Sequence, residues 1–216
     1  LRLKLHTEDY SLPLMDLTEK PDIQRTDSYE LQDLLMDYYS PDQMEGSVLI
    51  TRSNKRANLF NQEIRRRILF REEEINAGDL LMVVKNNYFW LEPESPAGFI
   101  ANGEIIELLR IRSYEEKYGL RFAEMEFQML DYPGQSEVSA KVILSTLDSA
   151  GPALMREDQD RLFEGVMADH SHIINRQARL EAVRNDPWYN ALQIKFAYAL
   201  TCHKTQGGQW ENVFID

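Results

Sequence analysis

The sequence has one cysteine, no long apolar run and fewer basic than acidic residues, and each shortage narrows the class of protein. Cys202 cannot form a disulfide within the chain, which agrees with a reducing compartment. No apolar run approaches the roughly 18 residues of a membrane-spanning helix, and residues 1–10 mix charged side chains in place of a signal peptide. We therefore expect a cytoplasmic protein that does not bind a membrane.

The net charge of -12, from 24 basic and 36 acidic residues, argues against a protein that coats nucleic acid non-specifically. The basic residues are nevertheless clustered. Six of them lie between Arg52 and Arg67 with one acid, Glu63, and no acid occurs between Asp186 and Glu211. These two windows are the parts of the chain that favour an anionic partner.

A phosphate-binding loop of the form Gly-x-x-x-x-Gly-Lys-Ser/Thr is also absent from the sequence. The lysine and hydroxyl that hold ATP phosphates and Mg²⁺ in such loops cannot come from this chain. We expect the chain alone to bind no cofactor and to hydrolyse no ATP. Because it starts at Leu1 without methionine and stops just after the apolar run 213–215, we also expect it to be part of a longer protein.

Apolar periodicity at the two ends of the chain predicts an α/β fold. Asp27, with Glu30 three residues later, predicts the start of an amphipathic helix that ends at Ser40-Pro41. Residues 47–51 predict a short buried strand, and Ser53 is expected to cap the helix that follows. Residues 194–201 form a nearly continuous apolar run, as expected for one parallel strand covered on both faces.

The middle of the chain predicts β structure followed by helices. Strands are expected at 80–84, 104–111 and 138–147, and residues 123–129 alternate between apolar and polar side chains. This pattern is typical of a small barrel or a curled sheet. Between 152 and 184, apolar spacing predicts two helices broken around residues 170–172. We therefore expect one domain from 1–74 and 187–216, with 75–186 inserted into it.

The most specific segment runs from Thr201 to Trp210, TCHKTQGGQW, between two apolar strands. A polar loop with adjacent glycines lets backbone amides approach a phosphate closely, and Thr201, His203 and Lys204 add donors and positive charge. The segment resembles motif V of RecD-like superfamily 1 DNA helicases, the group of the exodeoxyribonuclease V alpha subunit. Thr205 stands where that motif has serine, and Gln209 stands where many relatives have glutamate.

The resemblance implies roles for individual residues of this loop. Thr201, His203 and Lys204 are the expected contacts with the backbone of single-stranded DNA. Gln206, Gly207, Gly208 and Gln209 are expected to face the nucleotide cleft of the motor.

Two further segments resemble the same helicases. Residues 48–58 resemble the region around motif IV, where a strand feeds the basic first turn of a helix, and Thr51, Arg52 and Asn54 become expected DNA contacts. Residues 78–88 and 100–104 resemble the opening of an SH3-like barrel inserted into the second motor domain. There Asn86, Asn87 and Tyr88 are either DNA contacts, with Tyr88 stacking on a base, or ordinary turn and core-edge residues.

Several residues favour plain structural interpretations. Arg65, Arg66 and Arg67 are expected to be solvated surface charges. His170 and His172 lack a third ligand at metal-binding spacing, so we expect a surface pair and no metal site. Cys202 has no catalytic partner in sequence and is expected to be a small buried residue.

Together the resemblance implies a RecA-like, P-loop-NTPase-type second motor domain with an inserted SH3-like β-barrel and helical hairpin. The implied function is part of an ATP-dependent DNA helicase, moving 5′ to 3′, whose ATP and Mg²⁺ are bound by the intact parent. The implied partners are single-stranded DNA, a first motor domain of the same protein, and recombination or repair subunits. The alternative is a non-motor nucleic-acid-binding or scaffold module that has lost ATP hydrolysis, and a fused nuclease is a third possibility.

Overall fold

The computed structural model describes residues 19–27, 30–40, 44–92 and 94–216, in a chain that divides into two compact units, Leu1–Asp37 and Tyr38–Asp216. Helix α2 (Glu30–Tyr38) begins as predicted, because the Asp27 carboxylate accepts a hydrogen bond from the Glu30 amide at 3.0 Å. Residues 1–10 and Pro41, which the sequence predictions also used, lie outside the described residues.

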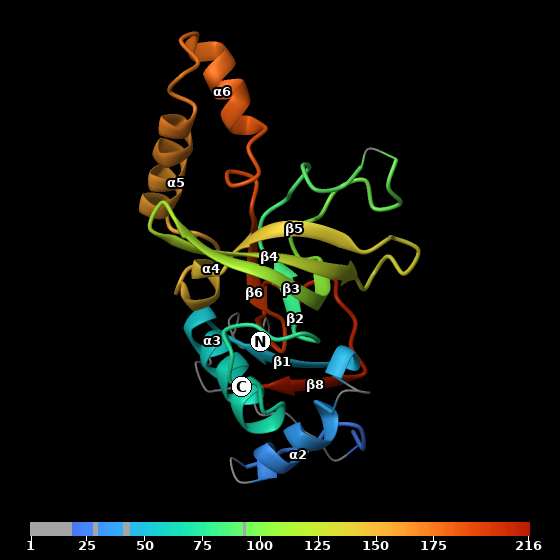
Figure 1. Cartoon of the computed structure of the whole chain (residues 1–216). Helices are drawn as coiled ribbons and strands as arrows, with labels where there is room; N and C mark the ends of the chain where they lie inside the picture. The colour runs from blue at the N-terminus through green and yellow to red at the C-terminus, as the bar shows by residue number, and fades with distance from the viewer. Residues whose placement is uncertain (1–18, 28–29, 41–43, 93) are drawn as a thin grey trace, which may run out of the picture. The chain divides into compact units, whose positions relative to one another are not determined.

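A small parallel sheet lies at one end of the second unit (Figure 1). It contains β1 (Ser47–Thr51), β7 (Ala199–Thr201) and β8 (Asn212–Ile215) in the order β7-β1-β8, and a short 3₁₀ turn η1 (Met44–Gly46) leads into β1. The predicted strand at 47–51 is confirmed. Helix α3 (Asn54–Glu63) follows β1 and packs on β1 and β7. Its cap is Ser53, as predicted, whose side chain accepts from the Arg56 amide.

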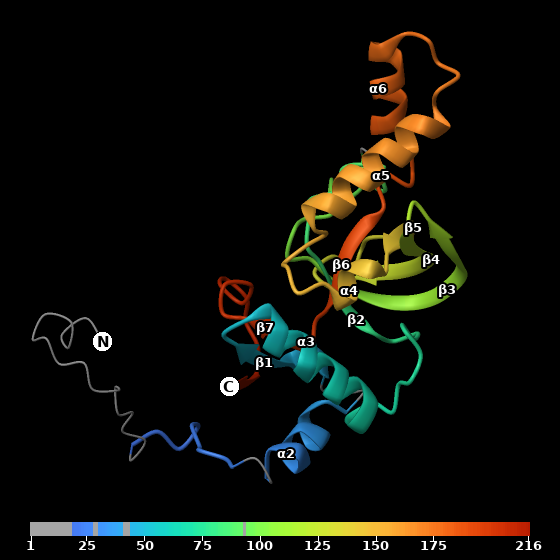
Figure 2. The same ribbon diagram turned by 90° about the vertical axis from the view of Figure 1, so that its left-hand side faces the viewer.

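The middle of the chain forms a closed five-stranded barrel (Figures 1 and 2). Its strands are β2 (Leu80–Val83), β3 (Ile105–Lys117), β4 (Leu120–Met129), β5 (Val138–Ile143) and β6 (Leu192–Phe196). Strands β2 to β5 pair in sequence order, each antiparallel with the next. Strand β6, from much later in the sequence, closes the barrel by pairing antiparallel with β2 and parallel with β5. The predicted alternation in β4 is confirmed, because Ala123, Met125, Phe127 and Met129 are all buried.

A helical hairpin projects from the barrel on the side away from the parallel sheet (Figures 1 and 2). After the short α4 (Ser145–Asp148), helices α5 (Arg156–Asp169) and α6 (Arg176–Arg184) pack against each other. The predicted break at residues 170–172 is confirmed. Leu162, Val166 and Val183 pack with Phe122 of the barrel, so the base of the hairpin shares the barrel's core.

The predicted RecA-like core is wrong. Such a core is a parallel sheet of several strands with helices on both faces, whereas the described residues contain three short parallel strands beside a closed barrel. The apolar run at 194–201, expected to be one strand, is divided between β6 of the barrel and β7 of the sheet. Burial on both faces gives the same sequence pattern in either setting, so hydrophobicity did not distinguish them.

A buried carboxylate, Asp79, joins the barrel to the parallel sheet. Arg65 contacts both its oxygens at 3.0 and 3.1 Å, Arg71 donates to it at 2.8 Å and the Tyr198 hydroxyl at 2.9 Å. Asp79 is 0% and Arg65 is 2% exposed. Arg65 lies in the π-helical turn η2 (Ile64–Ile68) and over the Phe196 ring. The prediction that Arg65 is a solvated charge is therefore wrong, while Arg66 and Arg67 are exposed as expected.

Replacing this carboxylate should strongly destabilise the fold. Asp79→Asn leaves the buried Arg65 without its counter-charge, and we expect the free energy of unfolding to fall by about 3–5 kcal/mol in urea titrations. The matched control is Glu63→Gln, which removes an exposed ion pair with Arg67 and should cost at most about 1 kcal/mol. Equal losses for the two variants would show that the buried network does not hold the barrel and the parallel sheet together.

Candidate functional site

The carboxyl ends of β1 and β7 lie side by side, which brings two of the predicted segments together. Thr51 is the register partner of Thr201, and the Cys202 amide donates to the Thr51 carbonyl at 3.0 Å. The chain therefore leaves both strands at one edge of the sheet, toward Arg52 on one side and His203 on the other. We call the exposed and half-buried residues at this edge, Arg52 to Lys55 and Cys202 to Gln209, the sheet-edge surface.

On the β1 side, the three predicted contacts differ in accessibility. Thr51 is buried, and its hydroxyl donates to the Ser53 carbonyl at 3.1 Å, so this side chain is used within the fold. Arg52 is exposed and has no carboxylate partner among the described residues, and Asn54 opens α3 half-buried. The amides of Asn54 and Lys55 in the first helical turn have no acceptor in the described protein, as at any helix start. An anion would meet Arg52 and these amides.

On the β7 side, the loop is held by two successive turns. Amides of Lys204 and Thr205 donate to the Thr201 carbonyl, and that of Gly208 donates to the Thr205 carbonyl. The amides of residues 203, 206, 207, 209 and 210 have no acceptor among the described residues. The loop thus has several N–H donors that the described protein leaves for another acceptor, and backbone amides of this kind can bind oxyanions.

The two adjacent glycines are needed for different reasons. Gly207 has a φ of +86°, which side chains rarely adopt. Gly208 lies under the Trp210 ring, where a Cβ would stand 2.1 Å from the nearest ring carbon. Gln206 and Gln209 are exposed beside them, and their side chains have no hydrogen-bond partner in the described part of the chain. These four residues, predicted to face a nucleotide, form an open surface of the loop.

Lys204 connects the sheet-edge surface to the barrel. Its ammonium group donates to the Asn102 side-chain oxygen at 2.6 Å, and burial lowers its pKa. Two of its three N–H donors are left for another acceptor. His203 is exposed. Cys202 is exposed too, so its predicted burial is wrong.

The third predicted segment is attached through the same asparagine. The Asn102 amide donates to the Asn86 side chain at 2.8 Å, and Tyr88 stacks on Phe99 with ring centroids 4.8 Å apart. Tyr88 is 71% exposed, so one aromatic surface remains open. Asn87 is structural, because it forms a bridge with Ile100 and donates to the Asn190 carbonyl at 2.7 Å. Residues from three distant segments therefore lie along one connected path.

The histidine pair lies at the break of the helical hairpin, as predicted. His170 contacts the Asp186 carboxylate at 3.0 Å, and the His172 ring lies 6.1 Å from the His170 ring. Among the described residues, no three His, Cys, Asp or Glu side chains are grouped as metal ligands would be. Every helix in the described part of the chain is too short or too polar to cross a bilayer.

Sequence reasoning missed the state of Glu104, which it noted only as part of an Asn-Gly-Glu turn. Its side chain is 6% exposed, and its Oε1 atom has no hydrogen-bond partner in the described protein. Burial, with a smaller contribution from Asp131, raises its pKa to about 7. No sequence signal separates such a glutamate from the solvated ones around it.

Comparison with known proteins adds no family assignment, since no protein-family model matches the chain and no curated protein matches it significantly.

The raised pKa of Glu104 makes a pH-dependent prediction. Folding raises this pKa from 4.5 to about 7, so its contribution to stability is complete below pH 4.5 and is lost as the pH rises to about 7. We expect Glu104→Gln, which stays neutral, to be more stable than the parent at pH 8 by on the order of 2–3 kcal/mol. At pH 4 the two should be nearly equal. Unfolding free energies that differ by the same amount at both pH values would contradict the assignment.

Proposed function

We propose that the chain binds the backbone of single-stranded DNA at the sheet-edge surface, as part of an ATP-dependent DNA helicase. The observation that carries the proposal is the Thr51 to Thr201 register. In this register, the two segments that resemble helicase motifs IV and V lie at the same edge of the sheet. The hydrogen bond from Lys204 to Asn102 links the third segment to them.

The chemistry of the surface supports a phosphate backbone as its ligand. Arg52, Lys55, His203 and Lys204 supply positive charge or donors, and the loop amides supply further donors without side-chain entropy. Contacts to phosphate fix the position of a strand but carry no direct sequence information. Binding here should depend on the number of phosphates and hardly on sequence.

In this proposal the catalytic part of the motor lies elsewhere in the parent protein. A separate P-loop domain binds ATP and Mg²⁺, and Gln206 to Gln209 contact its nucleotide, so that ATP hydrolysis alters the grip of Lys204 on DNA. The family resemblance implies 5′ to 3′ movement, a cytoplasmic location and recombination or repair partners.

A second candidate, a non-motor nucleic-acid-binding module, is favoured by one observation. The described residues form a three-stranded parallel sheet beside a barrel and lack the wider sheet expected of a motor domain. Both candidates use the same DNA surface. They differ in whether DNA binding is linked to ATP hydrolysis.

Salt dependence tests the DNA surface itself. Arg52→Ala and Lys204→Ala each remove one phosphate contact, so each should weaken binding of a single-stranded oligonucleotide and lower the slope of log affinity against log salt by roughly 0.7. Arg176→Ala is the control, because Arg176 is exposed on α6 and has no carboxylate partner among the described residues. Unchanged slopes in both site variants would exclude this surface.

ATP hydrolysis by the intact parent protein distinguishes the two candidates. A motor should hydrolyse ATP several times faster when single-stranded DNA is added, and Lys204→Ala should reduce this stimulation more than the basal rate. The Arg176→Ala parent serves again as the control. If the parent binds single-stranded DNA but hydrolyses no ATP in either condition, the helicase proposal fails and the binding module is the better description.

A further inference from the structure

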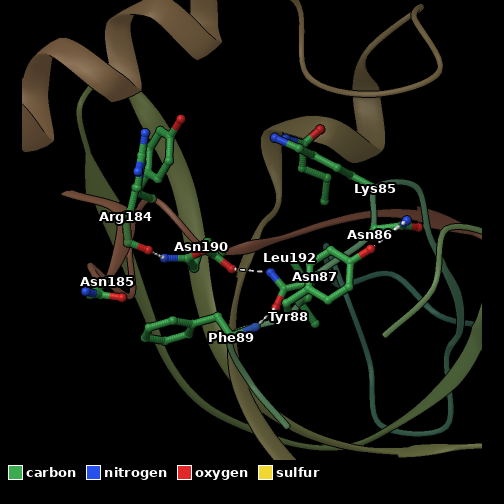
Figure 3. Close-up of a pocket in the computed structure, with 12 residues that line it drawn as sticks. Lys85, Asn86, Asn87, Tyr88, Phe89, Arg184, Asn185, Asn190 and Leu192 are labelled. Atoms are coloured by element: carbon green, nitrogen blue, oxygen red, sulfur yellow. Dashed lines mark hydrogen bonds between the residues drawn. The ribbon is translucent and has the colours of Figure 1, made fainter. Parts of the chain in front are cut away.

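A cavity of about 240 Å³ lies between the barrel and the base of the helical hairpin (Figure 3). One wall is the loop Lys85 to Phe89, which follows β2, and the other is the segment Arg184 to Gln193, which connects α6 to β6. The sheet-edge surface does not include it. We call it the hairpin-base cavity.

The walls of the cavity are fixed by hydrogen bonds, which Figure 3 shows in part. The Asn190 carbonyl accepts from the Asn87 side chain at 2.7 Å and from the Trp90 indole at 2.8 Å. The Asn190 side chain in turn donates to the carbonyls of Arg184 and Asp186. Asn190 therefore joins the two walls, and a ligand would meet a site that is already formed.

The charge of the cavity is opposite to that of the protein. Lys85 and Arg184 line it, and neither has a carboxylate partner in the described part of the chain. Among the described lining residues there is no Asp or Glu, although the whole chain has a net charge of -12. Asp186 is close in sequence, but its carboxylate accepts from the Trp188 amide and contacts His170. The lining of the cavity therefore has a local positive charge.

The other lining groups fit a flat heteroaromatic ring. Three aromatic residues and five amide side chains line the cavity: Tyr88, Phe89, Tyr189, Asn86, Asn87, Asn185, Asn190 and Gln193. Four of the amides hold the walls through hydrogen bonds within the fold, and the exposed Asn185 side chain has no partner among the described residues. Aromatic rings stack on bases, and a free amide side chain such as that of Asn185 can pair with a base edge. The volume is below the roughly 300–1,000 Å³ of pockets that enclose a whole drug-sized ligand. One base with its phosphate at the rim is a suitable size.

The cavity is also connected to the sheet-edge surface. Asn86 accepts from the Asn102 amide, and the Asn102 side chain accepts from Lys204. Hydrogen bonds therefore link Lys204, through Asn102 and Asn86, to the wall of the cavity.

We propose that the hairpin-base cavity binds one nucleotide, with its phosphate on Lys85 and Arg184 and its base among the aromatic and amide side chains. The inference rests on the proposed function for its preferred source, a nucleotide within a bound single strand. A free mononucleotide has the same chemistry and is the other source.

The test compares three ligands: an oligothymidylate, a strand of equal length without bases, and thymidine monophosphate. The double variant Lys85→Gln/Arg184→Gln should weaken oligothymidylate binding by roughly fivefold or more and reduce the preference over the abasic strand, since the base is no longer anchored. Asn185→Ala should reduce this preference without changing abasic binding, because its exposed side chain has no partner in the described protein. The control Arg176→Gln removes another exposed charge, which lies outside the cavity.

Each outcome supports or overturns the cavity. Variant-sensitive binding of the monophosphate supports it with a free nucleotide as ligand, and variant-sensitive binding of the oligonucleotide alone supports a strand. An unchanged preference for bases, with folding verified by circular dichroism, overturns it. If Arg52→Ala and Lys204→Ala weaken strand binding while the cavity variants do not, the cavity fails and the proposed function stands. The reverse pattern retains the cavity and rejects the sheet-edge surface.

Discussion

The fold depends on one buried carboxylate. Asp79 stands just before β2 and holds Arg65, Arg71 and Tyr198 together. Tyr198 lies between β6 and β7, and its carbonyl accepts from the Leu49 amide at 3.0 Å. Asp79 therefore fixes the point at which the chain leaves the barrel and enters the parallel sheet. Since β7 begins directly after Tyr198 and ends at Thr201, Asp79 helps to fix the strand that leads into the sheet-edge surface.

A second polar side chain supports the same transition. Asn61 on α3 accepts from the Ala199 amide at 2.8 Å and donates to the carbonyls of Phe196 and Ala199. It satisfies backbone groups that lie between two sheets and that neither sheet can pair. The π-helical turn that follows contains two adjacent buried residues, Ile64 and Arg65. The turn thus supplies the guanidinium that Asp79 requires.

Local features of the fold were predictable from sequence, and long-range ones were not. The β1 strand, the Ser53 cap, the alternation in β4 and the break in the helical hairpin each follow from a few neighbouring residues. The division of residues 194–201 between two sheets depends on Asp79 and Asn61, more than 110 residues earlier in the chain. The burial of Arg65 and the exposure of Cys202 have the same origin, because composition does not show which charges meet. For the candidate site, sequence placed the segments, but it gave neither the Lys204 to Asn102 bond nor the cavity.

The net negative charge of the protein is compatible with the proposed anionic ligand. Most of its described cations are already paired, and several of the unpaired ones lie at the two proposed binding surfaces. Glu126 contacts Arg110 and Arg112, Asp169 contacts Lys117, and Asp79 contacts two arginines. In the described part of Tyr38–Asp216, the cationic side chains with neither an acidic nor a hydrogen-bonding partner are Arg52, Lys55, Arg66, Lys85, Arg176 and Arg184. Two of these lie on the sheet-edge surface and two line the hairpin-base cavity. Net charge counts the paired residues, whereas a ligand meets the unpaired ones. An overall charge of -12 therefore argues against non-specific coating but is compatible with a local binding surface.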